Sequence, residues 1–152
     1  MDSKSRQRTV MVDIEEFLAK PYCIVDILPK QVPVDAGGQY FTIEKYFLSP
    51  PHVDAIYRKF ANVMLKLNCY DDIMVFKVDG ETWAENPAPD DLEQVVLERK
   101  PLFVVLKHAE AMISIPGDDH NMTVYGATET TLQLIGSIAS AEGLHVWKPE
   151  NT

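Results

Sequence analysis

The sequence predicts one α+β domain, with a mixed or largely antiparallel sheet packed with about three to four helices. The chain has 152 residues, which is the usual size of a single domain. Its composition is 46% hydrophobic and 24% charged, which favours a folded core over disorder. Helical and strand-like segments do not alternate regularly, as they would in a doubly wound parallel fold. We expect residues 1–9 to be a disordered N-terminal segment and residues 10–149 to form the domain.

The first two elements are predicted from apolar spacing and from the prolines that end them. Residues 10–19 carry apolar side chains at helical spacing, and Pro21 follows as a stop. Residues 22–28 are rich in β-branched and aromatic types and end at Pro29, which predicts a strand. Residues 30–38, with a proline and two glycines, predict a loop.

Residues 39–48 alternate in a way that predicts a second strand. We expect one face to point to the core, with Phe41, Ile43 and Phe47. The opposite face is expected to carry Tyr40, Thr42, Glu44 and Tyr46.

A long helix is predicted after Ser49, which is expected to cap it, with proline in the first turn. Its apolar stripe consists of Val53, Ile56, Tyr57, Phe60, Met64 and Leu67. Residues 73–78 and 81–83 predict a hairpin about Asp79-Gly80. A short helix to about residue 99 is expected to begin at Asp90 with an acidic capping box.

The C-terminal third predicts three strands, a helix and a last strand. Residues 102–106 are all apolar, which is typical of a central strand covered on both faces. Residues 111–115 and 121–125 predict a hairpin. Thr128 is expected to cap a helix that ends at Gly143, before a strand at residues 144–148.

The formal net charge of −9 disfavours binding to nucleic acid or to anionic lipid, and it permits a basic partner. No run approaches the roughly 18 apolar residues of a membrane span. Residues 1–9 are polar, without the apolar region of an export signal. Cys23 and Cys69 lie in apolar stretches and are expected to be buried and reduced. We therefore expect a cytoplasmic protein.

Two polar features are candidate sites. Asp118, Asp119 and His120 could bind a metal or act as an acid/base group, although Gly-Asp-Asp between two strands is also ordinary turn chemistry. Asp26 lies in the strand at residues 22–28, where a covered carboxylate would need a partner. The alternative is an edge position, or a partner such as a backbone N–H or Lys30.

Tyr40, Glu44 and Tyr46 form an aromatic and acidic strip that could bind a partner, unless a helix or loop covers it. The sequence contains no phosphate-binding glycine motif, no GxSxG and no HExxH or Cys/His pattern. We therefore predict no catalytic residue, no metal ligand set and no cofactor.

Two segments carry a resemblance: IVDILPKQVP at residues 24–33 and AEGLHVWKP at residues 141–149. They resemble pieces of small uncharacterised bacterial proteins. The resemblance implies a bacterial cytoplasmic origin and carries no activity or functional residue with it.

The leading hypothesis is a non-catalytic protein–protein interaction module, such as an immunity-like or antitoxin-like protein that covers a basic partner. The alternative is a small-molecule-binding protein or hydrolytic enzyme that uses Asp26 or Asp118, Asp119 and His120. A third hypothesis is self-association through the face with Tyr40 and Tyr46. A deep pocket with converging polar groups would favour the second hypothesis, and a flat patch the others.

Overall fold

The computed structural model describes residues 14–77 and 82–150, and within them it is a single α+β domain. Seven strands form one sheet in the order β3-β2-β4-β5-β6-β1-β7, and each neighbouring pair is antiparallel. The strands are β1 (Tyr22–Asp26), β2 (Ile73–Lys77), β3 (Thr82–Glu85), β4 (Leu102–Leu106), β5 (Ala111–Ile115), β6 (Asn121–Tyr125) and β7 (His145–Trp147). The predicted fold class is confirmed.

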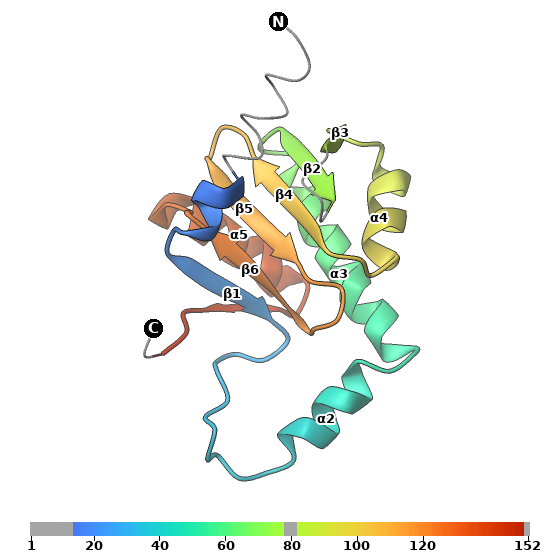
Figure 1. Cartoon of the computed structure of the whole chain (residues 1–152), viewed down its shortest axis with the longest axis vertical. Coiled ribbons are helices and arrows are strands. Elements are labelled where there is room, and N and C mark those ends of the chain that lie inside the picture. Colours follow the sequence, from blue (N-terminus) through green and yellow to red (C-terminus); the bar gives the residue numbers. More distant parts are fainter. Residues whose placement is uncertain (1–13, 78–81, 151–152) are drawn as a thin grey trace, which may run out of the picture.

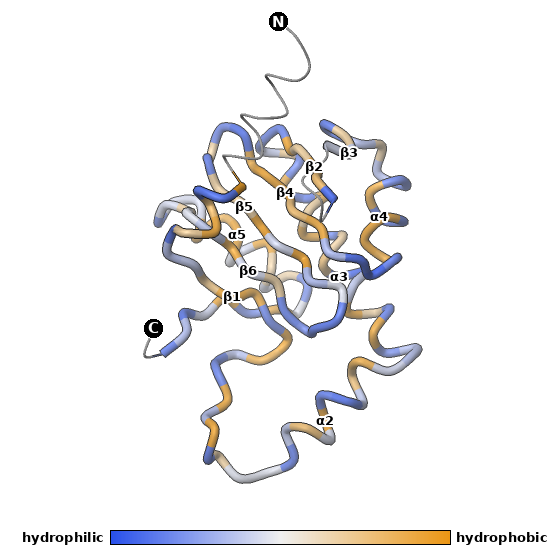
Figure 2. The backbone as a smooth tube through the Cα atoms, in the orientation of Figure 1, coloured by the Kyte–Doolittle hydropathy of each residue, from blue (hydrophilic) through white to orange (hydrophobic). Residues whose placement is uncertain are grey.

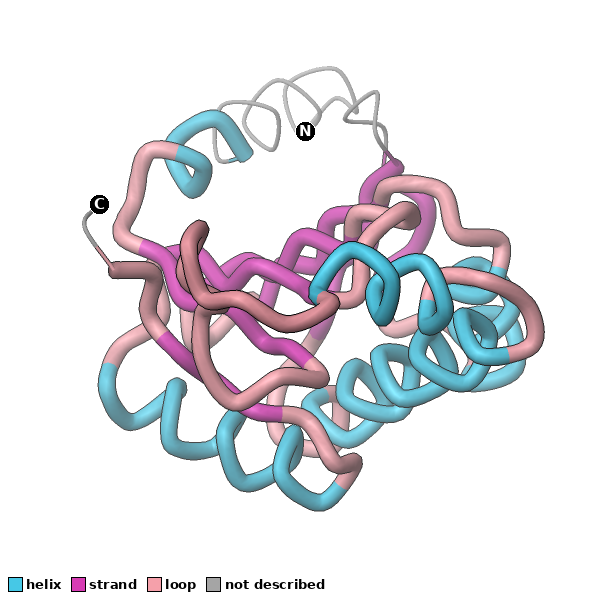
Figure 3. Tube along the Cα trace, turned by 90° about the horizontal axis from the view of Figure 1, so that it is seen from below, coloured by secondary structure: helices cyan, strands magenta, loops and turns pink. Residues whose placement is uncertain are grey.

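Three helices cover one face of the sheet, and the main core lies between them and the strands (Figures 1 and 3). They are α3 (His52–Leu67), α4 (Pro89–Leu97) and α5 (Glu129–Ala141). The predicted stripe of α3 is fully buried, and Figure 2 shows the apolar colouring that runs along the facing strands. Tyr57 and Phe60 are among its largest buried side chains.

A smaller cluster covers the other face of the sheet. Residues 14–18 are helical, and Ile14 and Phe17 pack there with Phe76 and Met112. This matches the second half of the helix predicted at residues 10–19. Residues 10–13 and the predicted disordered segment at 1–9 lie outside the described residues.

The strand predicted at residues 39–48 is wrong, because this segment forms helix α2 (Tyr40–Phe47). Phe41 and Ile43, which were expected to face the core, are exposed. In a segment this short, alternation and helical spacing overlap. One face of the helix carries side chains spaced three, one and three residues apart, and all of them line one cavity: Tyr40, Ile43, Glu44 and Phe47.

The two predicted hairpins are confirmed in their strands, β2 with β3 and β5 with β6, while residues 78–81 of the first turn lie outside the described part. β4 lies inside the sheet, between β2 and β5. Its burial is one-sided, since Phe103 and Val105 are only half-buried. The prediction of full cover on both faces is therefore half right.

Capping residues were predicted for three helices, α3, α4 and α5, and the prediction is confirmed for α5 alone. Thr128 caps α5 by accepting a bond from the Thr131 N–H at 3.2 Å, and Gly143 ends it with φ +78°. The Ser49 hydroxyl donates to the Lys45 carbonyl at 2.6 Å instead of capping α3. No side chain caps α4, which begins at Pro89 rather than at Asp90.

The two cysteines differ, because Cys23 is buried as predicted and Cys69 is exposed. Both are free thiols. No helix in the described part of the chain combines the length and the apolar character needed to cross a membrane.

Candidate functional site

A loop and helix α2 leave the body of the domain between β1 and α3, and Figure 1 shows them projecting beyond the end of the sheet. We call residues 27–51 the excursion. Its loop follows directly from Asp26, the last residue of β1, and α2 then returns the chain toward the connection between β5 and β6. The excursion therefore brings β1, α2 and that connection together.

Asp26 and His120 form a buried pair where these elements meet. The His120 Nδ1 lies 2.6 Å from the Asp26 Oδ1, and the side chains are 3% and 2% exposed. The β1–β6 ladder creates this proximity, because Asp26 pairs with Asn121, the residue after His120. The predicted need of Asp26 for a partner is met by His120 rather than by Lys30.

The other nitrogen of His120 continues the network into the excursion. Nε2 lies 3.0 Å from the Tyr40 hydroxyl, which donates to the Glu44 Oε2 at 2.9 Å. Tyr40 and Glu44 are one helical turn apart, so both side chains reach the same point. The chain of contacts runs from Asp26 through His120 and Tyr40 to Glu44.

The protonation of His120 decides the direction of these hydrogen bonds. The Tyr40 hydroxyl donates its one proton to Glu44, so its oxygen accepts from the His120 Nε2 when the imidazole carries both protons. The Asp26 hydrogen bond accordingly raises the pKa of His120, against the opposing effect of burial. Burial raises the pKa of the Tyr40 hydroxyl, and the bond to Glu44 adds to this.

Two of these side chains, Glu44 and His120, form a group with Asp119 that could hold a metal ion. One ligand atom each from Glu44, Asp119 and His120 lies within 4.8 Å of the others. The side chains of Glu44 and Asp119 are 30% and 43% exposed, so the group opens to solvent on one side. Asp118 is exposed and does not belong to it.

Tyr57 of α3 holds the connection between β5 and β6 by two hydrogen bonds to its backbone. The Tyr57 hydroxyl donates to the Asp119 carbonyl at 2.8 Å and receives the Asp119 N–H at 3.3 Å. Burial raises the pKa of Tyr57 to about 12, so the hydroxyl stays protonated at neutral pH. Gly117 supplies the turn with φ +92°. Asp118 is exposed, as expected for an ordinary turn residue, whereas His120 is buried.

Two hollows lie on the excursion. A cavity of 230 Å³ next to His120 is lined by Ile27, Leu28, Val32, Gly37, Gln39, Tyr40, Ile43, Glu44 and Phe47. A groove of 410 Å³ lies farther out, between the loop and α2, and is lined by Val32, Pro33, Val34, Ala36, Gly37, Gly38, Tyr40 and Phe41. We call the second hollow the outer groove. The cavity has polar groups at one end, whereas the groove is apolar.

The predicted strip of Tyr40, Glu44 and Tyr46 is divided by the helix. Tyr40 and Glu44 turn toward His120, whereas Tyr46 stays exposed and its ring stacks on His52 with centroids 4.1 Å apart. The sequence does not show that Asp26 and His120 form a pair, because they lie 94 residues apart and only the β1–β6 ladder brings them together.

Comparisons with protein-family models, with curated proteins and with solved structures find no match for this chain. This agrees with the resemblance to uncharacterised proteins, while the bacterial origin stays a prediction.

Proposed function

We propose that the chain is a non-catalytic protein-interaction module that docks a basic protein partner through the excursion. The observation that carries the proposal is that α2 buries none of its eight residues. A helix in a monomeric domain ordinarily buries one apolar stripe, and most of its stability comes from that packing. Phe47 packs partly buried against the main core, whereas Phe41, Ile43 and Tyr46 are exposed, and exposed apolar side chains gathered on one helix are typical of a surface that another molecule covers.

The exposed apolar residues concentrate on this part of the chain. Seven large hydrophobic side chains are exposed among the described residues, and four of them, Val34, Phe41, Ile43 and Tyr46, belong to the excursion. Phe41 is 80% exposed, and it lines the outer groove together with Val34. Figure 2 shows these apolar segments well away from the main body. An aromatic side chain at the edge of an apolar groove is a typical anchor of a protein interface.

The charge around the excursion favours a basic partner over a second copy. Glu44 on α2 and Asp119 lie together beside His120, and the net charge of the whole chain is −9. Two copies would bring like charges together, whereas a basic protein would be attracted and oriented. An immunity-like or antitoxin-like role in the bacterial cytoplasm is the form of this function that we propose.

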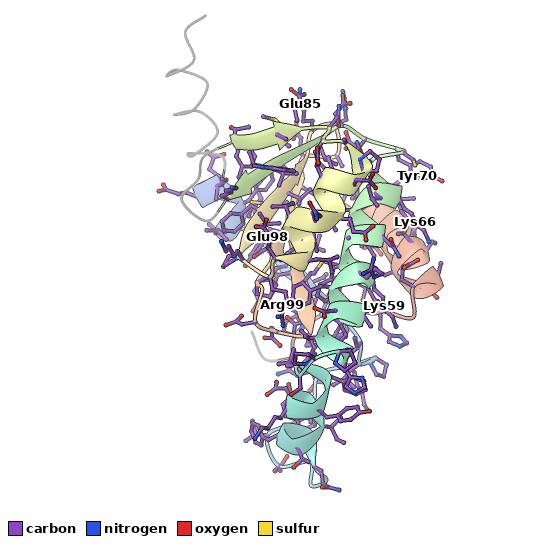
Figure 4. The ribbon with its side chains drawn as sticks, turned by 90° about the vertical axis from the view of Figure 1, so that its right-hand side faces the viewer. Lys59, Lys66, Tyr70, Glu85, Glu98 and Arg99 are labelled. Carbon is purple, nitrogen blue, oxygen red and sulfur yellow. The ribbon has the colours of Figure 1, made fainter. Side chains whose placement is uncertain are left out.

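Site-specific cross-linking tests the proposal. A photoreactive phenylalanine analogue at position 41, in cells that naturally produce the chain, should capture one basic protein. The same analogue at position 70 should not capture it, because Tyr70 is exposed at the other end of α3 (Figure 4). Against the purified partner, Phe41→Ala should weaken binding by about 1 to 4 kcal/mol, and Tyr70→Ala should leave it unchanged.

Both variants should keep the free energy of unfolding within about 0.5 kcal/mol of the wild type, because both side chains are exposed. Equal capture at positions 41 and 70 would contradict the docking surface. Capture of only a second copy of the chain would contradict the basic partner and favour self-association.

The 230 Å³ cavity favours a second candidate, the binding of a small molecule. Its walls are mostly apolar, and Tyr40, Glu44 and His120 converge at one end, as in many ligand sites. Hydrolysis through a covalent intermediate has less support, because Tyr40, Glu44 and Asp119 lie next to the His120 Nε2 within the described chain and none of them is a serine or cysteine nucleophile. A fragment screen by NMR should then shift the signals of Ile43 and His120 while sparing Phe41.

A further inference from the structure

We propose that Glu44, Asp119 and His120 form a binding site for a divalent transition metal ion, with Zn²⁺ as the best fit. One imidazole nitrogen and two carboxylate oxygens are ligands that zinc accepts, and three protein ligands leave a fourth position open. The inference does not depend on the proposed docking function, because it uses the inner side of α2 rather than Phe41 and the outer groove.

The spacing of the ligand atoms matches tetrahedral coordination. Metal–ligand bonds of about 2.0 to 2.2 Å place neighbouring ligands about 3.4 Å apart. The His120 Nε2 lies 3.5 Å from the Glu44 Oε2 and 3.8 Å from the Asp119 Oδ1. The Glu44 and Asp119 ligand atoms lie within 4.8 Å of each other, so a rotation of these two partly exposed side chains would close the group around an ion.

Asp26 completes the arrangement from behind. Histidines that bind a metal through one nitrogen usually donate from the other to a carboxylate, which orients the ring. The His120 Nδ1 makes this contact with Asp26 at 2.6 Å, inside the protein, and Nε2 points to the two exposed carboxylates. The burial of both side chains holds the ring in this orientation before any ion arrives.

The charges of the group also favour a cation. Asp26, Glu44 and Asp119 surround a single imidazole, so carboxylates outnumber basic groups at this point. These carboxylates repel one another in the free chain, and a divalent cation between them would offset that repulsion. The 230 Å³ cavity next to Glu44 and His120 leaves room for the water or small ligand that would fill the fourth position.

Tyr40 is the competitor of the ion in the free chain. Its hydroxyl lies 3.0 Å from the His120 Nε2, so a metal ion binds that nitrogen only when this contact breaks and the Nε2 proton is released to solvent. Tyr40→Phe removes the competing group and leaves the three ligands, so it should bind metal more tightly than the wild type. A merely adventitious surface site would not respond to this change.

The experiment is a titration of the full chain with Zn²⁺ by calorimetry at neutral pH, with Co²⁺ as a spectroscopic probe. We expect one ion per chain and the visible absorption of tetrahedral cobalt. Glu44→Gln and Asp119→Asn should each weaken binding about tenfold or more, and Tyr40→Phe should strengthen it. Metal-free protein should stay folded, because the hydrogen bonds of the group are complete without an ion.

Asp118→Asn is the matched control, since it removes the same charge one residue away from Asp119 and should keep the affinity within about twofold. His108→Ala tests the other histidine beside carboxylates, where Nδ1 lies 2.9 Å from Asp71. The proposal is overturned if no stoichiometric binding occurs, if Asp118→Asn and Asp119→Asn have equal effects, or if His108→Ala removes the site. Phe41→Ala should keep metal affinity, which separates this result from that of the docking test.

Discussion

Asp26→Ala should lower the free energy of unfolding by about 3 to 5 kcal/mol, the usual cost of removing one partner from a buried ion pair. The expected loss is large because His120 is 3% exposed and would keep its ring in the interior without the Asp26 carboxylate. Among the described residues, Asp26 is the partner of the His120 Nδ1, at 2.6 Å. Urea denaturation at neutral pH, followed by circular dichroism, measures the difference.

A matched pair on the surface gives the control. His108 and Asp71 also lie 2.9 Å apart through Nδ1, but the His108 side chain is 76% exposed. His108→Ala should therefore cost about 1 kcal/mol or less. If Asp26→Ala costs no more than His108→Ala, burial of the Asp26–His120 pair does not contribute in the way argued above.

The double variant Asp26→Leu with His120→Leu separates the pair from its surroundings. Two apolar side chains leave no unpaired group behind, so the double variant should be more stable than Asp26→Ala. The single variants Asp26→Leu and His120→Leu complete the comparison. If the double variant lowers the free energy of unfolding by the sum of the two single losses, the two residues act independently.

Elements specified by local chemistry were predictable from the sequence. Thr128 and Gly143 mark the two ends of α5, and the stripe from Val53 to Leu67 marks α3, because these signals need only neighbours along the chain. Residues 39–48 failed for a physical reason. A strand needs a partner strand, and α2 instead makes its own backbone bonds, such as Ile43 N–H to the Gln39 carbonyl.

The site was predictable only in pieces. Asp26, His120, Tyr40 and Glu44 were candidates in three separate features, but their meeting depends on the β1–β6 register and on the path of the excursion. Neither is visible in local periodicity. Tyr46, predicted on the same face, lies apart because six residues of helix turn it away from Tyr40.

Gly117→Ala should also destabilise the domain strongly, by about 2 kcal/mol or more, because two effects add. Gly117 has φ +92°, where residues with a Cβ are strained. A Cβ there would also lie 2.4 Å from the carbonyl oxygen of Arg99, which is backbone and cannot rotate away. The turn that carries Asp119 and His120 would have to shift.

Gly136→Ala is the control within the same chain. Gly136 lies inside α5, and a Cβ there meets nothing within 4 Å. Alanine is the better helix former, so this variant should gain about 0.5 to 1 kcal/mol. Thermal unfolding of both variants gives the comparison, and NMR of the His120 ring reports whether its position changes. Gly117→Ala with wild-type stability and an unchanged His120 signal would show that the connection adapts, and the site would then not depend on this turn.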